Sequence, residues 1–447
     1  MSSLNDAIKY FLSFETFVLL PIIIFVLALV FGIKIKVAIK SALQLGIGFV
    51  GMFMTFDYFV NIIQPVVSQL ILRSGLEMEV LDLGWPPLAA ITWSFNLAPV
   101  LLVSLILINA LMLLFKLTRT VNIDIWNYWH IIFLGAIIYH ITGNTLVTIT
   151  VSIITFILLL KLAEWIAPKV GDAMGMEGIC IPHLSGIIHY PLAIVGNSII
   201  DKIPGLNKVE ADSETIQEKL GVLGEPMIIG FILGLLLGIS AGYEFKEILS
   251  VAVRFSAVIF ILPKMSGILG ESLIPISHGM KSFMEKRLPN MGQTYIGLDV
   301  AILFGLPANM VTALLLIPTA IILAIILPGV NFIPLGDLTN LLVPVAFITL
   351  ATKGNVIRSY LIGIPVVIVT LYTASWVAPL LTDMAKVAEY NIIGTQGQFT
   401  SFLDGGNPFR VWIAMLFSGK LLAFAFIPIV IWLIYLTWKS RDKINVI

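Results

Sequence analysis

Two carboxylates stand in segments that otherwise lack charge, and they are the first candidates for chemistry. Glu225 lies in LGVLGEPMIIGFILGLLLG and Asp299 lies in YIGLDVAILFGLPAN. An ionisable side chain inside a membrane costs at least about 2.5 kcal/mol, so it is expected to have a ligand, a partner or water. We predict that both residues bind a ligand. For Glu225 a capping role stays open, because Pro226 suits the first turn of a helix and a carboxylate is stabilised there.

A second polar group interrupts an apolar run at YHITGN, which contains His140 and Asn144. Gly143 would open the helix at this point and free backbone groups for a ligand. We predict that His140 and Asn144 contact the ligand, and the alternative for His140 is a hydrogen bond between helices. Asn309 is a further candidate, with capping of the following helix as its alternative.

The histidines do not form a metal site. His183 and His189 lie six residues apart in CIPHLSGIIHYPLAIVGN, a spacing that does not put both on one helical face. We predict a hydrogen-bonding role in substrate binding for His189. His130 and His278 fit interfacial or loop positions. Asp404 begins DGGNP, whose glycines either let the backbone approach a ligand or form a tight turn.

No catalytic motif is recognisable in the sequence. It contains no nucleophilic triad, no GxxxxGK[ST] loop and no zinc-ligand spacing. The lone Cys180 excludes a disulfide within the chain. We therefore predict no bound cofactor or metal and no catalysis by this chain alone.

The elements that hold these residues are predicted to be membrane helices. The chain has 447 residues, of which 59% are hydrophobic and 12% charged, and its mean hydropathy is +1.03. A soluble domain has about 25% charged residues, so this chain has too little charge to cover a water-facing surface. Lipid can replace water as the solvent for the apolar excess. A formal net charge of zero argues against a nucleic-acid partner.

Apolar runs near 20 residues predict about 11 transmembrane helices. They lie at residues 11–33, 41–62, 96–115, 129–147, 148–167, 223–243, 247–263, 308–328, 338–352, 356–379 and 411–437. Gly and Pro interrupt two shorter apolar pieces, 83–95 and 296–307, which we interpret as re-entrant segments. Ordinary loops are the alternative. Lys and Arg concentrate in alternate loops, which predicts a cytoplasmic C-terminus.

The chain repeats itself at a spacing of about 210 residues. The matches in the first half are Glu15, Gly32, Gly143-Asn144, Trp165, Ala167-Pro168 and Asp172. Their counterparts are Glu225, Gly242, Gly354-Asn355, Trp376, Ala378-Pro379 and Asp383. An odd number of predicted crossings separates equivalent positions, so the second copy would be inverted, as in many carriers with broken helices.

These patterns predict an all-α polytopic membrane protein built from two inverted repeats with re-entrant segments, plus one extra C-terminal helix. We place the first membrane repeat at 1–200, a cytoplasmic linker at 201–220 and the second repeat at 221–383. A glycine-rich loop and the C-terminal transmembrane helix follow at 384–447.

Five segments carry a resemblance to a known family. They are GVLGEPMIIGFILG, HLSGIIHYPLAIVGNSIIDKIPGLNK, IPISHGMKSFMEKR, YIGLDVAI and DGGNPFR. The chain resembles the galactitol-type membrane subunit (the IIC component) of the bacterial sugar phosphotransferase system, over nearly its whole length. It is similar, more distantly, to the ascorbate membrane subunit of that system.

The resemblance implies a function and partners. The chain would bind a polyol, with galactitol the first expectation, in a bacterial inner membrane. A separate cytoplasmic IIB protein carrying a phosphocysteine would phosphorylate the polyol, and a IIA protein would supply IIB. By analogy with the ascorbate relatives, the resemblance also implies a homodimer whose core domain moves like an elevator. Glu225 matches the GEP motif and Asp299 the GLD segment, and His140 and Asn144 lie in the polar break before the fifth predicted helix.

Two alternatives remain open from the residues alone. A carrier of a small polar solute driven by H⁺ or Na⁺ would use the same inverted repeat and buried carboxylates. An intramembrane enzyme would need converging catalytic groups, for which His140 with Asp299 is the only candidate pair.

Overall fold

The computed structural model describes residues 14, 16–74, 79–209, 211, 225–287, 293–334, 336–388 and 397–441. Parts of the predictions fall outside these ranges. They include Glu15, the first residues of the predicted spans 11–33 and 223–243, most of the predicted linker (residues 210 and 212–220), and residues 389–396 and 442–447 of the predicted C-terminal segment.

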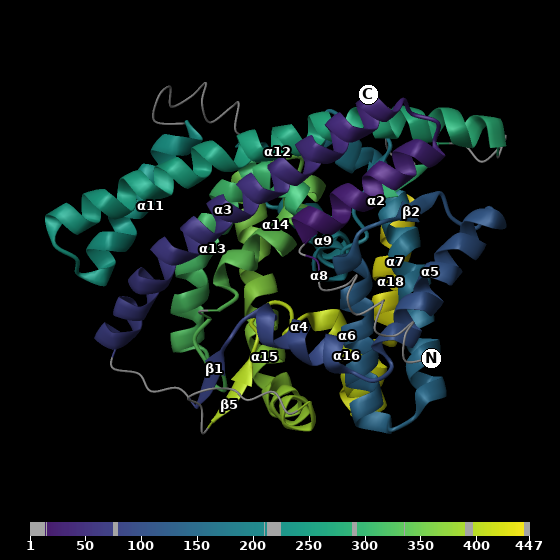
Figure 1. Cartoon of the computed structure of the whole chain (residues 1–447). Coiled ribbons are helices and arrows are strands. Elements are labelled where there is room, and N and C mark those ends of the chain that lie inside the picture. Colours follow the sequence, from purple (N-terminus) through teal and green to yellow (C-terminus); the bar gives the residue numbers. More distant parts are fainter. Residues whose placement is uncertain are drawn as a thin grey trace.

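Four helices form two hairpins that pack against each other. In the first hairpin α2 (Thr16–Val30) turns into α3 (Ile35–Ser74), and in the second α11 (Pro226–Ala241) turns into α12 (Phe245–Arg287). The turn of each hairpin contains a glycine with positive φ, Gly32 at 76° and Gly242 at 74°. Figure 1 shows α3 and α12 running along one side of the molecule, away from β1 and β5. We call these four helices the hairpin arm.

The remaining helices gather beside the hairpin arm (Figure 1). The first half supplies α4 (Trp85–Ser94), α5 (Ala98–Leu114), α6 (Ile125–Thr142), α7 (Thr145–Met174), α8 (Leu184–Ile187) and α9 (His189–Ile200). The second half supplies the 3₁₀ helix η3 (Val300–Gly305), α13 (Pro307–Ile326), the 3₁₀ helix η4 (Leu338–Leu341), α14 (Leu342–Ala351) and α15 (Val356–Val387). The chain then continues through α16 (Pro408–Phe417), α17 (Leu421–Ala425) and α18 (Ile427–Ser440). We call this assembly the core bundle.

Helix ends in the core bundle follow sequence signals that the repeat also marks. Asn144 caps α7 by accepting hydrogen bonds from the N–H groups of Leu146 and Val147. Asn355 caps α15 in the same way, with Arg358 as the donor. An asparagine that pairs with free backbone N–H groups stabilises the start of a helix, so these two positions define where α7 and α15 begin.

The apolar helices confirm an all-helical membrane architecture. Among the described residues, five helices are long and apolar enough to cross a membrane, and a sixth span is reached if α4 and α5, bent by 92°, count as one. Shorter apolar helices occupy several other predicted spans, including α2, α11 and α14. The predicted total of about 11 spans stays a prediction. The predicted C-terminal span 411–437 is shifted and divided: α16 begins before it and ends within it, and α17 with α18 forms a membrane-length apolar segment, Leu421–Ser440.

Short parallel strands are a feature that the hydropathy pattern does not predict. β1 (Val80–Asp82) pairs with β5 (Gln398–Thr400), and β4 (Tyr295–Gly297) lies between β2 (Thr120–Asn122) and β3 (Ile179–Cys180). Each strand has at most three residues. Their backbone groups are paired inside the protein, which is what the apolar surroundings require of non-helical chain.

The two predicted re-entrant segments differ from each other. Residues 83–95 form the half-helix α4, which Pro86 and Pro87 begin and which ends before the sharp bend into α5. Residues 296–307 form the end of β4 and the 3₁₀ helix η3. Both segments are largely buried within the core bundle.

Candidate functional site

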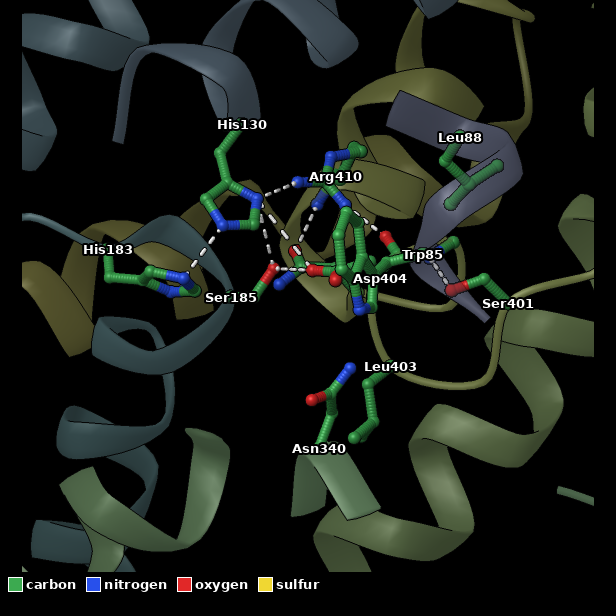
Figure 2. Close-up of polar contacts among 12 residues, drawn as sticks. Trp85, Leu88, His130, His183, Ser185, Asn340, Ser401, Leu403, Asp404 and Arg410 are labelled. Atoms are coloured by element: carbon green, nitrogen blue, oxygen red, sulfur yellow. Dashed lines mark hydrogen bonds and ion pairs between the residues drawn. The ribbon is translucent and has the colours of Figure 1, made fainter. Parts of the chain in front are cut away.

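A cluster of buried polar side chains lies inside the core bundle. Its members come from α6, the β3–α8 region, η4 and the chain after β5, and each is at most 9% exposed. We call this cluster, together with Asp82 at the end of β1, the polar core: Asp82, His130, His183, Ser185, Asp337, Ser401, Asp404 and Arg410. Figure 2 shows most of these side chains converging on one region.

Asp82 joins three separate segments of the chain. Its Oδ1 accepts hydrogen bonds from the N–H groups of Gly84 and Phe402, both at 3.1 Å. Its Oδ2 accepts from the N–H groups of Gly336 at 3.0 Å and Asp337 at 3.2 Å. A carboxylate that satisfies several buried donors fixes the segments carrying them, so Asp82 sets the relative positions of α4, η4 and the β5–α16 loop.

Asp337 completes this junction from the opposite half of the chain. Its carboxylate accepts hydrogen bonds from the backbone or side chains of Trp85, Asn340, Ser401, Leu403 and Asp404. Gly84 and Gly336 pass so closely that a Cβ on Gly336 would lie 2.4 Å from the Gly84 nitrogen. The start of α4 is therefore pressed against η4 by main-chain contact.

His130 contacts several other members of the polar core, including His183 and Arg410 (Figure 2). Its Nε2 is 2.8 Å from the Nε2 of His183, and its Nδ1 is 3.1 Å from an Nη2 of Arg410. Ser185 donates to Asp404 at 2.6 Å, and its Oγ is also 3.4 Å from His130 Nδ1. The polar core is thus one connected network from Asp337 through Asp404 to the two histidines.

Arg410 is a fully buried cation. Its guanidinium donates to the carbonyl oxygen of Asp404 and lies 4.6 Å from the centre of the Phe133 ring. A buried charge requires a partner of opposite charge, and the carboxylate of Asp404 is the near one. The two glycines between Asp404 and Asn407 allow this loop to fold tightly, because a Cβ on Gly406 would lie 2.3 Å from the Phe402 carbonyl oxygen. This contact within the loop corresponds to the tight-turn alternative for DGGNP, and an approach of its backbone to a ligand stays a prediction.

A second carboxylate pair lies beside the β2–β4 strands. Asp124, the N-cap of α6, accepts a hydrogen bond from the Trp126 N–H group at 3.1 Å, and Asp299, the N-cap of η3, accepts one from the Ala301 N–H group at 2.8 Å. The two carboxyl groups interact electrostatically, so they lie near each other. Asn127 donates to Asn122 at 2.9 Å and to the carbonyl oxygen of Leu298 at 3.2 Å, which ties α6 to this pair.

Several buried polar atoms in and around the polar core have no hydrogen-bond partner among the described residues. The donors and acceptors concerned are on Asn122, Asp124, Asn127, Trp129, His183, His189, Asn309, Asn407 and Arg410. Buried polar groups are nearly always paired, and an unpaired one costs about 1–3 kcal/mol. So many unpaired atoms in one region indicate a place where a hydrogen-bonding ligand or ordered water completes the structure.

Three of the predicted site residues lie in this region. Asp299 lies near Asp124, as described. His189 is buried at the start of α9, where its Nδ1 bonds the Gly186 carbonyl oxygen at 3.1 Å and its Nε2 is unpaired. Asn309 is buried in the first turn of α13 and donates to the Leu303 carbonyl oxygen, while its Oδ1 is unpaired.

The other three predicted residues lie elsewhere. Glu225 is the half-buried N-cap of α11 on the hairpin arm, and its side chain makes no capping hydrogen bond. His140 is half-buried in the last turn of α6, about 15 Å along that helix from His130. Asn144 is exposed and caps α7, so its side-chain oxygen is already occupied.

Sequence reasoning missed the centre of the site. The expectation that His130 is interfacial or in a loop is wrong, because α6 begins at Ile125 and buries nearly all of its first four turns. Arg410 and Asp337 are not among the predicted site residues, and the lysine and arginine pattern instead assigns Arg410 to an outside loop. The available signal for Arg410 was a lone cation beside DGGNP, in a stretch otherwise suited to a membrane helix. Apart from Asn340, three residues away, the partners of Asp337 lie more than 60 residues away or in the other half, so little in the local sequence marks it.

Comparison with known proteins gives the family of this chain. The profile of the PTS system sugar-specific permease component, EIIC-GAT, matches residues 10–395. The chain belongs to this family. The galactitol-specific EIIC component of the PTS system in Escherichia coli K12 is 33% identical to it over 438 residues, which is 97% of this chain and 96% of the relative. The galactitol-specific EIIC component of E. coli O157:H7 has the same identity and coverage.

Membership of the EIIC-GAT family confirms the resemblance found in the sequence. The chain is accordingly a multi-pass membrane permease component of a phosphotransferase system. The profile match ends at residue 395, whereas the polar core includes Ser401, Asp404 and Arg410. The alignments with the E. coli relatives cover more of the chain than the profile does, 97% of its length.

Proposed function

We propose that this EIIC-GAT permease component binds a polyol, galactitol, in the polar core and moves it across the membrane. The observation that carries this proposal is the set of unpaired buried donors and acceptors around the polar core. Each hydroxyl of a polyol offers one donor and two acceptor lone pairs, so a polyol can satisfy groups of both kinds. A neutral polyol also adds no further charge to a region already rich in carboxyl groups.

The proposed contacts are Asp299, His189 and Asn309, together with His183 and Trp129. Trp129, His183, His189 and Asn309 are buried, and each has a polar side-chain atom without a hydrogen-bond partner among the described residues. Asp299 is half-buried and lies near Asp124, which also has such an atom. Glu225, His140 and Asn144 lie away from the polar core in this conformation, so we assign them contacts along the path of the polyol. These three residues would contribute to the entry or exit of the polyol. They would have a smaller effect on the affinity of this conformation for the polyol.

Two inverted repeats are the architecture that we propose for this chain, and the carboxylate pairs support it. Each pair joins the halves: Asp82 of the first half meets Asp337 of the second, and Asp299 of the second meets Asp124 of the first. In both pairs one aspartate lies at or just after a short strand and the other precedes a helix. Such an exchange is expected when two equivalent halves are related by a two-fold axis.

The strands support the same proposal. β4 of the second half lies between β2 and β3 of the first. Conversely, β1 of the first half pairs with β5, and its Val80 N–H also donates to the Asn331 carbonyl oxygen of the second half at 3.3 Å. β4 thus has strands of the first half on both sides, and β1 contacts a segment of the second half beside its pairing with β5.

We further propose that the core bundle moves against the hairpin arm in an elevator-type motion, within a homodimer. The hairpin arm is made of long helices that pack mainly on each other, whereas the polar core lies in the core bundle. α3 also presents a row of exposed apolar side chains, including Leu43, Ile47 and Met54, to lipid or to a second copy. The positive-inside distribution supports a cytoplasmic C-terminus.

Phosphorylation by a separate IIB protein is the step that we propose for release. Cys180 is fully buried in β3, which is unsuited to carrying a phosphoryl group between proteins. A phosphorylated polyol carries nearly two negative charges and would be repelled by Asp299 and Asp404. Phosphorylation would therefore lower the affinity of the polar core for its own product.

A proton-coupled carrier is the second candidate, and one observation favours it. Asp124 and Asp299 are two neighbouring carboxyl groups inside the core bundle, where an exchangeable proton would be bound during transport. Such a carrier would release an unmodified polyol.

Titration calorimetry with galactitol on the purified protein tests the binding proposal. We expect Asp299→Asn to weaken galactitol binding at least tenfold, because one acceptor oxygen of the pair is replaced by a donor. The matched control is Asp383→Asn, since Asp383 is exposed and its ion-pair partner within the described part of the chain is Lys386, one turn away. Equal affinity of both variants would contradict the assignment of the site.

A further inference from the structure

We propose that Arg410 sets the proton position on His183 through His130, so that His183 offers a fixed Nδ1–H donor to a hydroxyl oxygen of the substrate. This inference rests on the proposed function, because it concerns how the same polar core recognises a polyol. Arg410 and His130 act as positioning residues, and His183 makes the contact.

The first link is the contact between Arg410 and His130. A guanidinium carries only donors, so the 3.1 Å contact of its Nη2 with His130 Nδ1 requires a lone pair on that nitrogen. A neutral imidazole with an unprotonated Nδ1 carries its proton on Nε2. Arg410 therefore selects the Nε2–H tautomer of His130.

The second link is the contact between the histidines. The two Nε2 atoms are 2.8 Å apart, a distance at which one proton is shared by donation from one ring to the other. Since His130 carries that proton, His183 accepts it and must hold its own proton on Nδ1. The Nδ1 of His183 has no partner among the described residues, and His183 is only 6% exposed.

Two other groups face His130 Nδ1 and would favour the opposite tautomer. Asp404 Oδ1 lies 3.7 Å away and Ser185 Oγ lies 3.4 Å away. Both are farther than Arg410, and Ser185 already gives its hydroxyl proton to Asp404 at 2.6 Å. Arg410 is also held in place by the Asp404 carbonyl oxygen and the Phe133 ring, so it cannot turn away. The closest contact therefore decides where the proton lies.

The consequence is a specific recognition chemistry. An N–H group at His183 binds a lone pair, and a hydroxyl oxygen of a polyol supplies one. A deoxy analogue that lacks this hydroxyl leaves a buried donor unpaired, which is how a hydrogen-bonding site rejects a ligand that lacks one group. His183 thus discriminates for a hydroxyl at one position of the substrate.

Nitrogen-15 solid-state NMR of the full chain in lipid bilayers, with labelled histidine and no substrate, tests the tautomers proposed for His130 and His183. We call this dependence of the His183 tautomer on Arg410 the relay. The chain has five histidines, and His183→Gln and His130→Gln assign the two signals by their loss. We expect protonated Nε2 with bare Nδ1 on His130, and the reverse on His183. In Arg410→Met, Ser185 and Asp404 become the remaining groups at His130 Nδ1, so both tautomers should switch. The control is Arg254→Met, because Arg254 is exposed on α12. A proton on His183 Nε2 in the unmodified chain, or unchanged tautomers in Arg410→Met, would overturn the relay.

Binding of monodeoxy galactitols to the unmodified chain tests the contact itself and does not depend on the folding of Arg410→Met. We expect one deoxy position to weaken binding at least tenfold in the unmodified chain and less than threefold in His183→Phe. If every deoxy position loses the same factor in both proteins, His183 makes no such contact. Failure of galactitol to bind the unmodified chain would instead contradict the proposed function. The NMR experiment would still show whether Arg410 sets the tautomers of His130 and His183.

Discussion

Replacing Gly336 with alanine probes the junction that positions α4 against η4. The added Cβ would lie 2.4 Å from the Gly84 nitrogen, 2.5 Å from the Leu83 carbonyl carbon and 2.8 Å from the Asp82 carbonyl oxygen. All three atoms belong to the main chain, so no side chain can rotate to make room. The two strands of chain must therefore separate by roughly 1 Å to restore ordinary van der Waals contact.

The size of the effect follows from what this separation breaks. Overpacking a filled interior costs about 1–3 kcal/mol. The hydrogen bonds from the Gly336 and Asp337 N–H groups to Asp82 Oδ2, at 3.0 and 3.2 Å, would stretch as well. Each contributes about 1 kcal/mol. We expect Gly336→Ala to lower the free energy of unfolding by about 2–5 kcal/mol.

The assay is reversible unfolding in mixed detergent micelles, followed by tryptophan fluorescence, with galactitol affinity measured in parallel. Gly267→Ala is the matched control, because Gly267 lies in α12 with no atom within 4 Å of the added Cβ. In a helix this change is expected to be neutral or to stabilise by about 0.5–1 kcal/mol. If Gly336→Ala is as stable as Gly267→Ala, the close junction between the two halves is wrong.

Two further predictions concern the cap of α7 and the carboxylate of Glu164. Asn144→Ala should lower the free energy of unfolding by about 1 kcal/mol, because α7 loses its cap. Galactitol affinity should stay within twofold of that of the unmodified chain. A tenfold loss of affinity would instead show that Asn144 contacts the ligand in this conformation. Glu164 accepts hydrogen bonds from the Thr118 hydroxyl, from the Arg119 backbone and side chain and from Lys161, so Glu164→Ala should destabilise by about 2–4 kcal/mol. Asp383→Ala, at an exposed pair, should show no measurable change in the same unfolding assay.

The elements that could be predicted from sequence are the helices that form long, continuous apolar runs. Hydropathy predicts the first residues of α5, α7, α13 and α15 to within three positions, because a helix in lipid must be apolar over most of its length. The polar last turns of α7 and α15 extend beyond the predicted spans, which end at 167 and 379. The repeat also marked Asn144 and Asn355, which both begin helices. These signals are local, or they recur at a constant spacing, so they can be recognised in a single sequence.

The polar core could be predicted only in part. Asp299 and His189 are recognisable as polar residues in apolar segments; His189 is buried with an unpaired Nε2, and Asp299 is half-buried near Asp124, whose Oδ2 is unpaired among the described residues. Arg410, by contrast, contacts His130 across 280 positions of the chain. The short strands were missed because two or three residues have no detectable period and their pairing joins distant segments.

The most direct test of the central claim is uptake of radiolabelled galactitol into lipid vesicles that contain this chain, with and without its phosphorylated IIB protein. We predict that galactitol phosphate accumulates only when phosphorylated IIB is present, and that Asp383→Asn behaves like the unmodified chain whereas Asp299→Asn does not. Accumulation of unmodified galactitol with a pH gradient alone, and no dependence on IIB, would contradict the account and favour a proton-coupled carrier.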